Sequence, residues 1–237
     1  MAELRLPARL RRNGHLKSPL RKGSLRGAAA WLIEQSFPVE ILDFFVACPE
    51  HLRAGEPAAP PAAPDHRLVS IRTMADCQRL GEPLLNRLGR QSGHGVRSII
   101  ASGGRVYALV EGGEILSQLT VDLNGPVAVE TPIPLRVALP GGSGFLSYLY
   151  TSPKWRGQGL AQRLLRLTAH ELGREGITRL VAHVSATNVN SQNVFLATGW
   201  QRAALVLTDR HRCVLYGGRG LANHGIAVTA RHHFALI

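Results

Sequence analysis

The chain has 237 residues, of which 45% are hydrophobic, and it carries a formal charge of +12. This length and apolar content suit a globular protein with one sizeable core, and they exclude disorder along most of the chain. Residues 1–26 hold eight Lys or Arg residues against one acid, so this arm carries +7 of the charge. The basic character therefore belongs mainly to an N-terminal arm.

The cysteines and the hydropathy pattern narrow the setting of the protein. Cys48, Cys77 and Cys213 form no CxxC pair, zinc spacing or disulfide framework, which favours a reducing, cytoplasmic location. No apolar run reaches the roughly 18 residues of a membrane span, and the stretch 28–33 is too short and too far along for a secretory signal. The histidines near the C-terminus match no familiar ligand spacing, so no metal is expected.

The first part of the chain is predicted to be an appendage. Residues 1–54 are interpreted as a basic extension with short amphipathic helices, one around Trp31 and another at 41–45, after Pro38. Residues 55–66 contain the tract GEPAAPPAAP, which favours extended backbone and indicates a linker.

A regular alternation of strand and helix patterns follows over residues 67–217. In chain order the patterns indicate a strand at 68–71, a helix at 75–88, strands at 106–110 and 115–121 around a Glu-Gly-Gly-Glu turn, a strand at 145–151, a helix at 159–174, a strand at 180–184, a helix at 191–198, and strands at 203–207 and 213–216. Residues 124–144, with four prolines, are predicted to be a long excursion, and 218–237 a tail that adds a strand or covers a sheet edge. This order predicts an α/β (α+β) domain with a strand–helix–strand crossover.

The most informative segment lies between the strand at 145–151 and the helix that follows it. It reads Arg156-Gly157-Gln158-Gly159-Leu160-Ala161, and its glycines allow a tight turn and a close approach of the backbone to a ligand. The first N–H groups of the helix and its dipole make such a junction an anion site, suited to a pyrophosphate. Lys154 and Arg156 add positive charge. The plainer alternative is a tight turn into a helix, since neither a Walker A nor a dinucleotide spacing is present.

Two segments together resemble a known family. Arg156-x-x-Gly159-x-Ala161 is similar to the [QR]-x-x-G-x-[GA] motif of the GNAT (GCN5-related) N-acetyltransferase superfamily. Residues 188–200, NVNSQNVFLATGW, are similar to the N-x-x-[AS]-x-x-[LV]-[YF]-x-x-x-G-[FW] segment of that family. The resemblance spans about 67–217. It implies the GNAT fold: a central mixed, mostly antiparallel sheet, splayed at the cofactor site and flanked by helices.

The resemblance also implies a donor, acetyl-CoA or another acyl-CoA, and residues that bind it. The amides of the glycine loop would hold the pyrophosphate, the end of the preceding strand would pair with the pantetheine arm, and the later motif would lie along that arm. The residues so assigned are Leu149, Tyr150, Thr151, Arg156, Gly157, Gln158, Gly159, Leu160, Ala161, Asn188 and Ser191.

Family chemistry is direct attack of a neutral amine on the thioester, aided by a general base and often by a tyrosine that protonates the thiolate. This sequence departs from that pattern, because Phe195 stands at the usual tyrosine position and His183 where some members have a base glutamate. His183 is a plausible base, since histidine is largely neutral near pH 7, although a packed strand histidine fits equally. Tyr148, Tyr150 and Tyr216 are alternative acids.

Several functions stay open at this point. The leading one is transfer of an acetyl or longer acyl group to an amine on a small molecule or a protein. An acyl carrier protein as donor, or a GNAT-like module that binds CoA or a protein without turnover, are the alternatives. The basic arm suits an acidic partner, namely the carrier protein, a nucleic acid or an anionic membrane, or it is a solvated tail.

Overall fold

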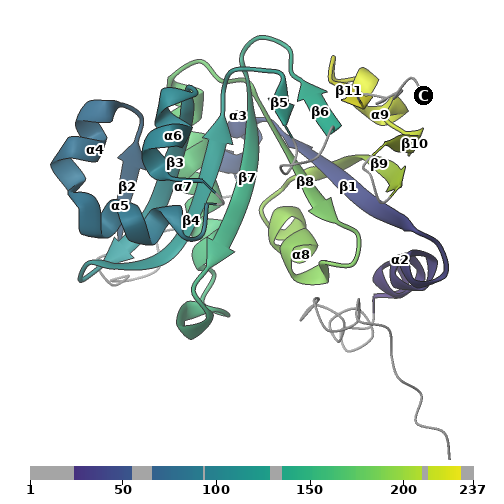
Figure 1. Cartoon of the computed structure of the whole chain (residues 1–237), viewed down its shortest axis with the longest axis horizontal. Coiled ribbons are helices and arrows are strands. Elements are labelled where there is room, and N and C mark those ends of the chain that lie inside the picture. The colour runs from purple at the N-terminus through teal and green to yellow at the C-terminus, as the bar shows by residue number, and fades with distance from the viewer. Residues whose placement is uncertain (1–23, 55–65, 93, 129–134, 210–212, 231–237) are drawn as a thin grey trace, which may run out of the picture.

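The computed structural model describes residues 24–54, 66–92, 94–128, 135–209 and 213–230. Their core is an eight-stranded sheet in the order β10-β9-β1-β8-β7-β4-β3-β2 (Figure 1). Every neighbouring pair is antiparallel except β7 and β8, which are parallel and are joined by the helix α7. The strands are β1 (Val39–Ala47), β2 (Arg67–Ile71), β3 (Gly104–Glu111), β4 (Glu114–Asp122), β7 (Ser143–Thr151), β8 (Arg179–Ser185), β9 (Gln201–Asp209) and β10 (Val214–Gly217).

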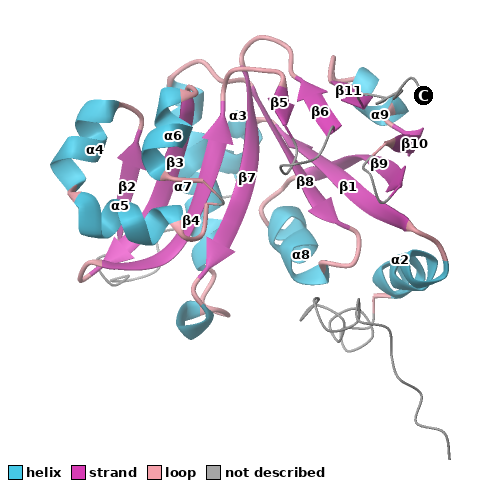
Figure 2. Cartoon of the chain, in the orientation of Figure 1, coloured by secondary structure: helices cyan, strands magenta, loops and turns pink. Residues whose placement is uncertain are grey.

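Helices cover both faces of this sheet (Figure 2). On β3, Val106 and Ala108 pack with the helices α4 (Met74–Leu80), α5 (Glu82–Gly89) and α6 (Val96–Ala101). The alternate residues Tyr107 and Leu109 pack on the other face, with α3 (Pro49–Ala54), α7 (Leu160–Arg174) and α8 (Val189–Ala197). Period-two alternation on a strand thus assigns α4–α6 and α7 to opposite faces.

A second, three-stranded sheet lies on the face opposite α7. It has the order β11-β6-β5 and consists of β5 (Val127–Ala128), β6 (Leu135–Ala138) and β11 (Ala227–Ala230), with α9 (Arg219–Ala222) beside it. Val127 and Val137 pack there against Phe44 of β1 and Phe145 of β7. The excursion at 124–144 and the C-terminal tail therefore contribute to one core.

The sequence analysis is confirmed for most of the region after residue 66. Each strand expected between 68 and 216 is present, and so are the helices at 159–174 and 191–198, within a few residues at their ends. The helix expected at 75–88 is instead two helices, because Gly81 between them has φ +76°, which a continuing α-helix cannot accommodate. The sheet domain with flanking helices is the fold class that the sequence predicted.

The interpretation of residues 1–54 as a mere extension with two helices is wrong in its second half. The first helix exists as α2 (Leu25–Ser36), but residues 39–47 form β1, in the interior of the sheet between β8 and β9. Phe44 and Phe45 point to opposite faces and both are fully buried. A strand covered on both faces has a continuous apolar run, which periodicity alone does not distinguish from a helix. The linker assigned to 55–66 lies almost entirely outside the described residues.

Candidate functional site

The two parallel strands of the sheet pair over only part of their length. The register runs from Ser143↔Arg179 to Leu146↔Ala182, and in the described residues no β7–β8 pairing continues beyond it. From Ser147 to Thr151, β7 is hydrogen-bonded to β4 on its other side. The backbone of β7 that faces β8 is therefore open to a ligand, at the place where the resemblance puts the pantetheine arm.

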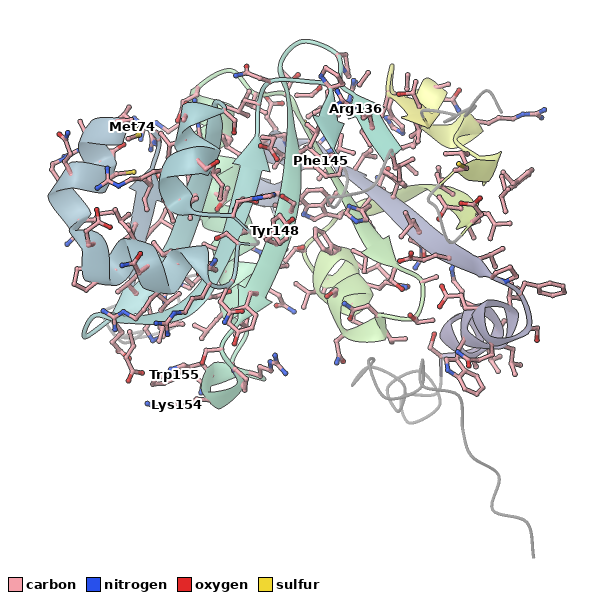
Figure 3. The ribbon with its side chains drawn as sticks, viewed as in Figure 1. Met74, Arg136, Phe145, Tyr148, Lys154 and Trp155 are labelled. Atoms are coloured by element: carbon pink, nitrogen blue, oxygen red, sulfur yellow. The ribbon has the colours of Figure 1, made fainter. Side chains whose placement is uncertain are left out.

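A break in the β4–β7 ladder marks the start of this open region. The register shifts between Gln118 and Thr120, and Tyr148 opposite the shift has φ +51°, the only positive φ of a non-glycine residue in the described chain. A bulge of this kind re-aims a side chain. Here it leaves Tyr148 37% exposed (Figure 3), whereas residues 143–146 of the same strand are buried.

An open cleft of about 810 Å³ follows the separation of the strands. It lies on the α5–α6 face, with Ser92, His94 and Ser98 on one wall. We call the parts of β7 and β8 that line the cleft where the two strands separate the arms of the splay. They contribute Phe145, Leu146, Ser147, Tyr148 and Leu149 from β7 and His183, Val184 and Ser185 from β8. Such a cleft at the point where a sheet opens is the place to expect a binding site.

The glycine loop lies at the N-terminus of α7. Gly157 and Gly159 have φ of +82° and +73°, and a Cβ built on either would meet no atom within 4 Å. They are therefore required for their backbone conformation, and the space around them is open. Gly159 is the N-cap of α7, no side chain caps the helix, and its first turn holds no acid. No side chain therefore caps the first amides of this 15-residue helix, where the sequence analysis places an anion site.

The cations beside the loop are held in place. Arg156 donates from Nε to the Thr151 carbonyl at 3.1 Å and so ties the loop to the end of β7. Lys154 lies 3.2 Å from Glu114 and over the Trp155 ring, at 4.9 Å from its centroid, in the short turn η2 (Pro153–Trp155; Figure 3). The hydrogen bond from Lys154 lowers the pKa of Glu114. The loop thus carries positive charge at a fixed position.

The later motif forms the start of α8. Asn188 accepts a hydrogen bond from the Ser191 N–H at 3.2 Å and caps the helix, and both residues line the cleft. Gln192 donates to the Ser185 and Ala186 carbonyls at 3.2 and 2.8 Å. These bonds set the path of the chain between β8 and α8.

Gln192 also connects this turn to the N-terminal segment. Its Oε1 accepts from Arg202 at 2.9 Å, and Arg202 lies 3.4 Å from the fully buried carboxylate of Asp43 in β1. Arg26 of α2 forms a further ion pair with Asp43. The wall of the cleft formed by β8 and α8 is therefore supported by residues outside the resembling region.

The two departures from the family pattern have different environments. Phe195 is buried between Phe45 and Trp200, with ring centroids 5.4 and 4.9 Å away, and acts as core. His183 is half-buried on the arm of β8, one residue beyond the last paired position, and stacks on Phe145 at 5.8 Å. Both residues line the cleft, but Phe195 has no proton to give.

The three alternative acids, Tyr148, Tyr150 and Tyr216, lie at different distances from the cleft. Tyr148 lines the cleft, on the arm opposite His183. Tyr150 is not among the residues that line it, although it lies on the same strand. Tyr216 is 71% exposed on the edge strand β10, with three strands between it and β7, so its candidacy as an acid is wrong.

Three residues that line the cleft were not predicted from the sequence. Asp122 ends β4, His94 precedes α6, and Glu40 begins β1, and all three line the cleft. Burial raises the pKa of Asp122, while the nearby His94 acts in the opposite direction. No local motif marks these residues, because their proximity depends on the strand order. A polar residue at the end of an apolar strand pattern was the one available signal.

The described part of the chain contains neither a metal-binding group nor a membrane-spanning helix. No group of three or more His, Cys, Asp or Glu side chains there is arranged to hold a metal ion. No helix among them combines the length and the apolar character needed to cross a membrane.

Comparison with protein families agrees with the motifs. Residues 85–200 match the model of the acetyltransferase (GNAT) family. This range contains the glycine loop, both arms of the splay and the α8 segment. Residues 85–200 therefore form a domain of the GNAT acetyltransferase type, a family that uses acyl-CoA donors. A comparison with curated proteins finds no match.

Solved structures with a similar arrangement are distant in sequence. A GNAT-family protein from Novosphingobium aromaticivorans is 17% identical, with a TM-score of 0.46 over 71% of this chain and 62% of its own. A GCN5-related N-acetyltransferase from Kribbella flavida is 13% identical, with a TM-score of 0.46 over 76% and 62%. An aminoglycoside N-acetyltransferase in complex with CoA is 15% identical, with a TM-score of 0.42 over 57% and 92%. The chain thus spans less than two thirds of the first two.

Proposed function

We propose that the protein transfers an acyl group from a CoA thioester to an amine by direct attack. The observation that carries this proposal is the continuity of an anion-binding loop, an open strand edge and a cleft. Gly157 and Gly159 begin the path at α7, the open edge of β7 continues it, and the cleft ends it on the opposite face. A donor that enters from the α7 side would meet an acceptor that enters from the α5–α6 side.

The donor half of the site follows from the backbone. The amides of residues 158–161 bind the pyrophosphate, and Arg156 orders the loop. The peptide groups of Leu149 to Thr151 pair with the amides of pantetheine, while Asn188 and Ser191 flank the arm. Acetyl-CoA is the simplest donor.

The catalytic half uses the two arms of the splay. His183 removes the proton from the attacking amine, directly or through a water, and Tyr148 from the facing strand protonates the departing thiolate. A backbone amide of β7 beyond Leu146 polarises the thioester carbonyl. Phe195 takes no part in proton transfer and maintains the packing of α8.

Two other functions compete with this one. A carrier-protein donor depends on the basic arm, and residues 1–23 lie outside the described residues. A non-catalytic CoA-binding module is favoured by Phe195, but Tyr148 and His183 in one cleft provide the acid and base that it would not need. Release of free thiol in the presence of amines distinguishes turnover from binding.

The donor site is tested by a charge change at Gly159. Asn and Asp both tolerate positive φ better than other residues and have nearly the same shape. Gly159→Asp therefore differs from Gly159→Asn mainly in the charge that it places at the helix N-terminus, where it competes with the pyrophosphate. We expect Gly159→Asp to weaken CoA binding by at least about tenfold more than Gly159→Asn, measured by calorimetry. Equal affinities of the two variants would exclude this loop as the pyrophosphate site.

A further inference from the structure

The charge of the cleft is opposite to that of the chain. Among the described residues that line it, Glu40 and Asp122 are acids, and none is Lys or Arg. The whole sequence has 28 Lys and Arg residues against 16 acids. A cleft with acidic walls in a strongly basic chain favours a cationic ligand.

Of the two acids that line the cleft, Asp122 is closer in the sheet to the point where β7 and β8 separate. It pairs with Phe145 of β7, and the Phe145 ring stacks on His183. Within the described residues its carboxylate accepts no hydrogen bond and has no ion pair, and His94 is the single positive influence on it. Its burial raises its pKa, which is the effect of withdrawing a carboxylate from water without supplying a counter-ion.

From this arrangement we infer that Asp122 determines acceptor specificity: the acceptor carries a second, cationic nitrogen that pairs with Asp122 while its other nitrogen is acylated near His183. This inference rests on the proposed function, since it names the substrate class of the same cleft. The division of roles is chemically consistent. The attacking nitrogen must be neutral. The second nitrogen keeps its proton and supplies the positive counter-charge for the Asp122 carboxylate.

The sheet sets the span of such an acceptor. Asp122 is on β4 and His183 on β8, with β7 between them. Asp122 lies opposite Phe145 and Phe145 lies opposite Val181, so His183 is two residues further along β8. Two interstrand spacings and this offset together separate the backbones of Asp122 and His183 by roughly 12 Å. After the hydrogen bonds at each end are allowed for, a short aliphatic α,ω-diamine with four or five methylene groups bridges the two side chains. A monoamine of the same length reaches only one of them.

The test compares diamines with monoamines. Calorimetry in the presence of CoA measures the binding of 1,4-diaminobutane and 1,5-diaminopentane, and of butylamine and pentylamine. The wild-type protein is expected to bind the diamines about 10- to 100-fold more tightly, the range for one charged hydrogen-bonded pair. Asp122→Asn, of the same shape, should remove this preference, because it weakens the binding of the diamines more than that of the monoamines. Glu50→Gln, on the exposed surface of α3, should preserve it.

The outcomes separate this inference from the proposed function. Equal binding of diamines and monoamines by the wild-type protein would overturn the role of Asp122 without using any variant. An equal loss of both affinities in Asp122→Asn would also overturn it. A preference that depends on Asp122 supports it even if no thiol is released with any amine, in which case the transfer reaction fails instead. Thiol release with monoamines and diamines alike, at equal kcat/KM, supports the transfer and contradicts the specificity.

Discussion

At the scale of single residues, the proposed chemistry depends on His183 and Tyr148. They come from different arms of the splay and line the same space. A general base contributes about 10²- to 10⁴-fold to the rate. His183→Ala should therefore lower kcat by at least about 100-fold, with little change in the KM for acyl-CoA, because the histidine lies outside the donor path. Steady-state thiol release as a function of pH measures both constants.

A matched control variant tests whether the removal of any histidine lowers the rate. His170 lies on the exposed side of α7, away from the cleft, so His170→Ala should retain the wild-type rate. The loss of rate should therefore appear in His183→Ala and not in His170→Ala. If His183→Ala keeps the wild-type rate, the base is another group.

The residues of the site differ in how far the sequence reveals them. Gly157, Gly159 and Asn188 were predictable, because a backbone conformation or a helix cap leaves a local signature. Asp122 and His94 were not, since they are 28 positions apart and meet only through the order of strands and helices. The glycine loop and the helix cap were therefore visible in the sequence, and the residues that β4 and the start of α6 contribute to the cleft were not.

At the scale of elements, the start of α4 shows how a local sequence motif contributes to the stability of the fold. Asp76 accepts from the Arg72 and Thr73 backbone N–H groups, each at 2.9 Å, and completes a capping box with Thr73. These hydrogen bonds, that from Arg72 first, lower the pKa of Asp76 from 3.8 to about 2. Asp76→Ala should reduce the free energy of unfolding by about 1 kcal/mol at pH 7.

The sign of the pH dependence follows from the lowered pKa. The ionised carboxylate stabilises the folded state fully above the unfolded pKa of about 4, and this contribution is lost as the pH falls toward 2. The difference between wild type and Asp76→Ala in urea unfolding should thus narrow between pH 5 and pH 3. Arg79→Ala, which removes an exposed partner of Asp76, should cost less than about 0.5 kcal/mol. A gap of constant size across this pH range would contradict the assignment.

Element types were predictable where one face is solvated or a glycine ends a helix. The exception, β1, is instructive because its residues Leu42, Phe44 and Phe45 are all buried. Its apolar run lacks the alternation of a half-exposed strand, and its partners β8 and β9 lie more than 130 residues further along the chain. Only the tertiary arrangement identifies it as a strand.

At the scale of the whole molecule, the strand β1, which precedes the family match, is part of the same sheet as the cleft. The family match begins at residue 85, yet β1 fills the position between β8 and β9. Asp43 of this strand, through Arg202 and Gln192, supports the turn that leads into α8. A strand that precedes the family match thus supports one wall of the cleft.

This arrangement predicts the result of trimming the chain. A chain that begins at Cys48 lacks β1 and leaves β8 and β9 without their shared neighbour. Leu42, Phe44 and Phe45 each contribute about 2 kcal/mol through burial, and their sum is comparable with the 5–15 kcal/mol that stabilises an ordinary domain. We expect this chain to show no cooperative thermal transition, whereas a chain that begins at Ser24 retains every described element and should retain the transition. Circular dichroism on heating distinguishes the two, and cooperative unfolding of the shorter chain at the full-length Tm would show that β1 is dispensable.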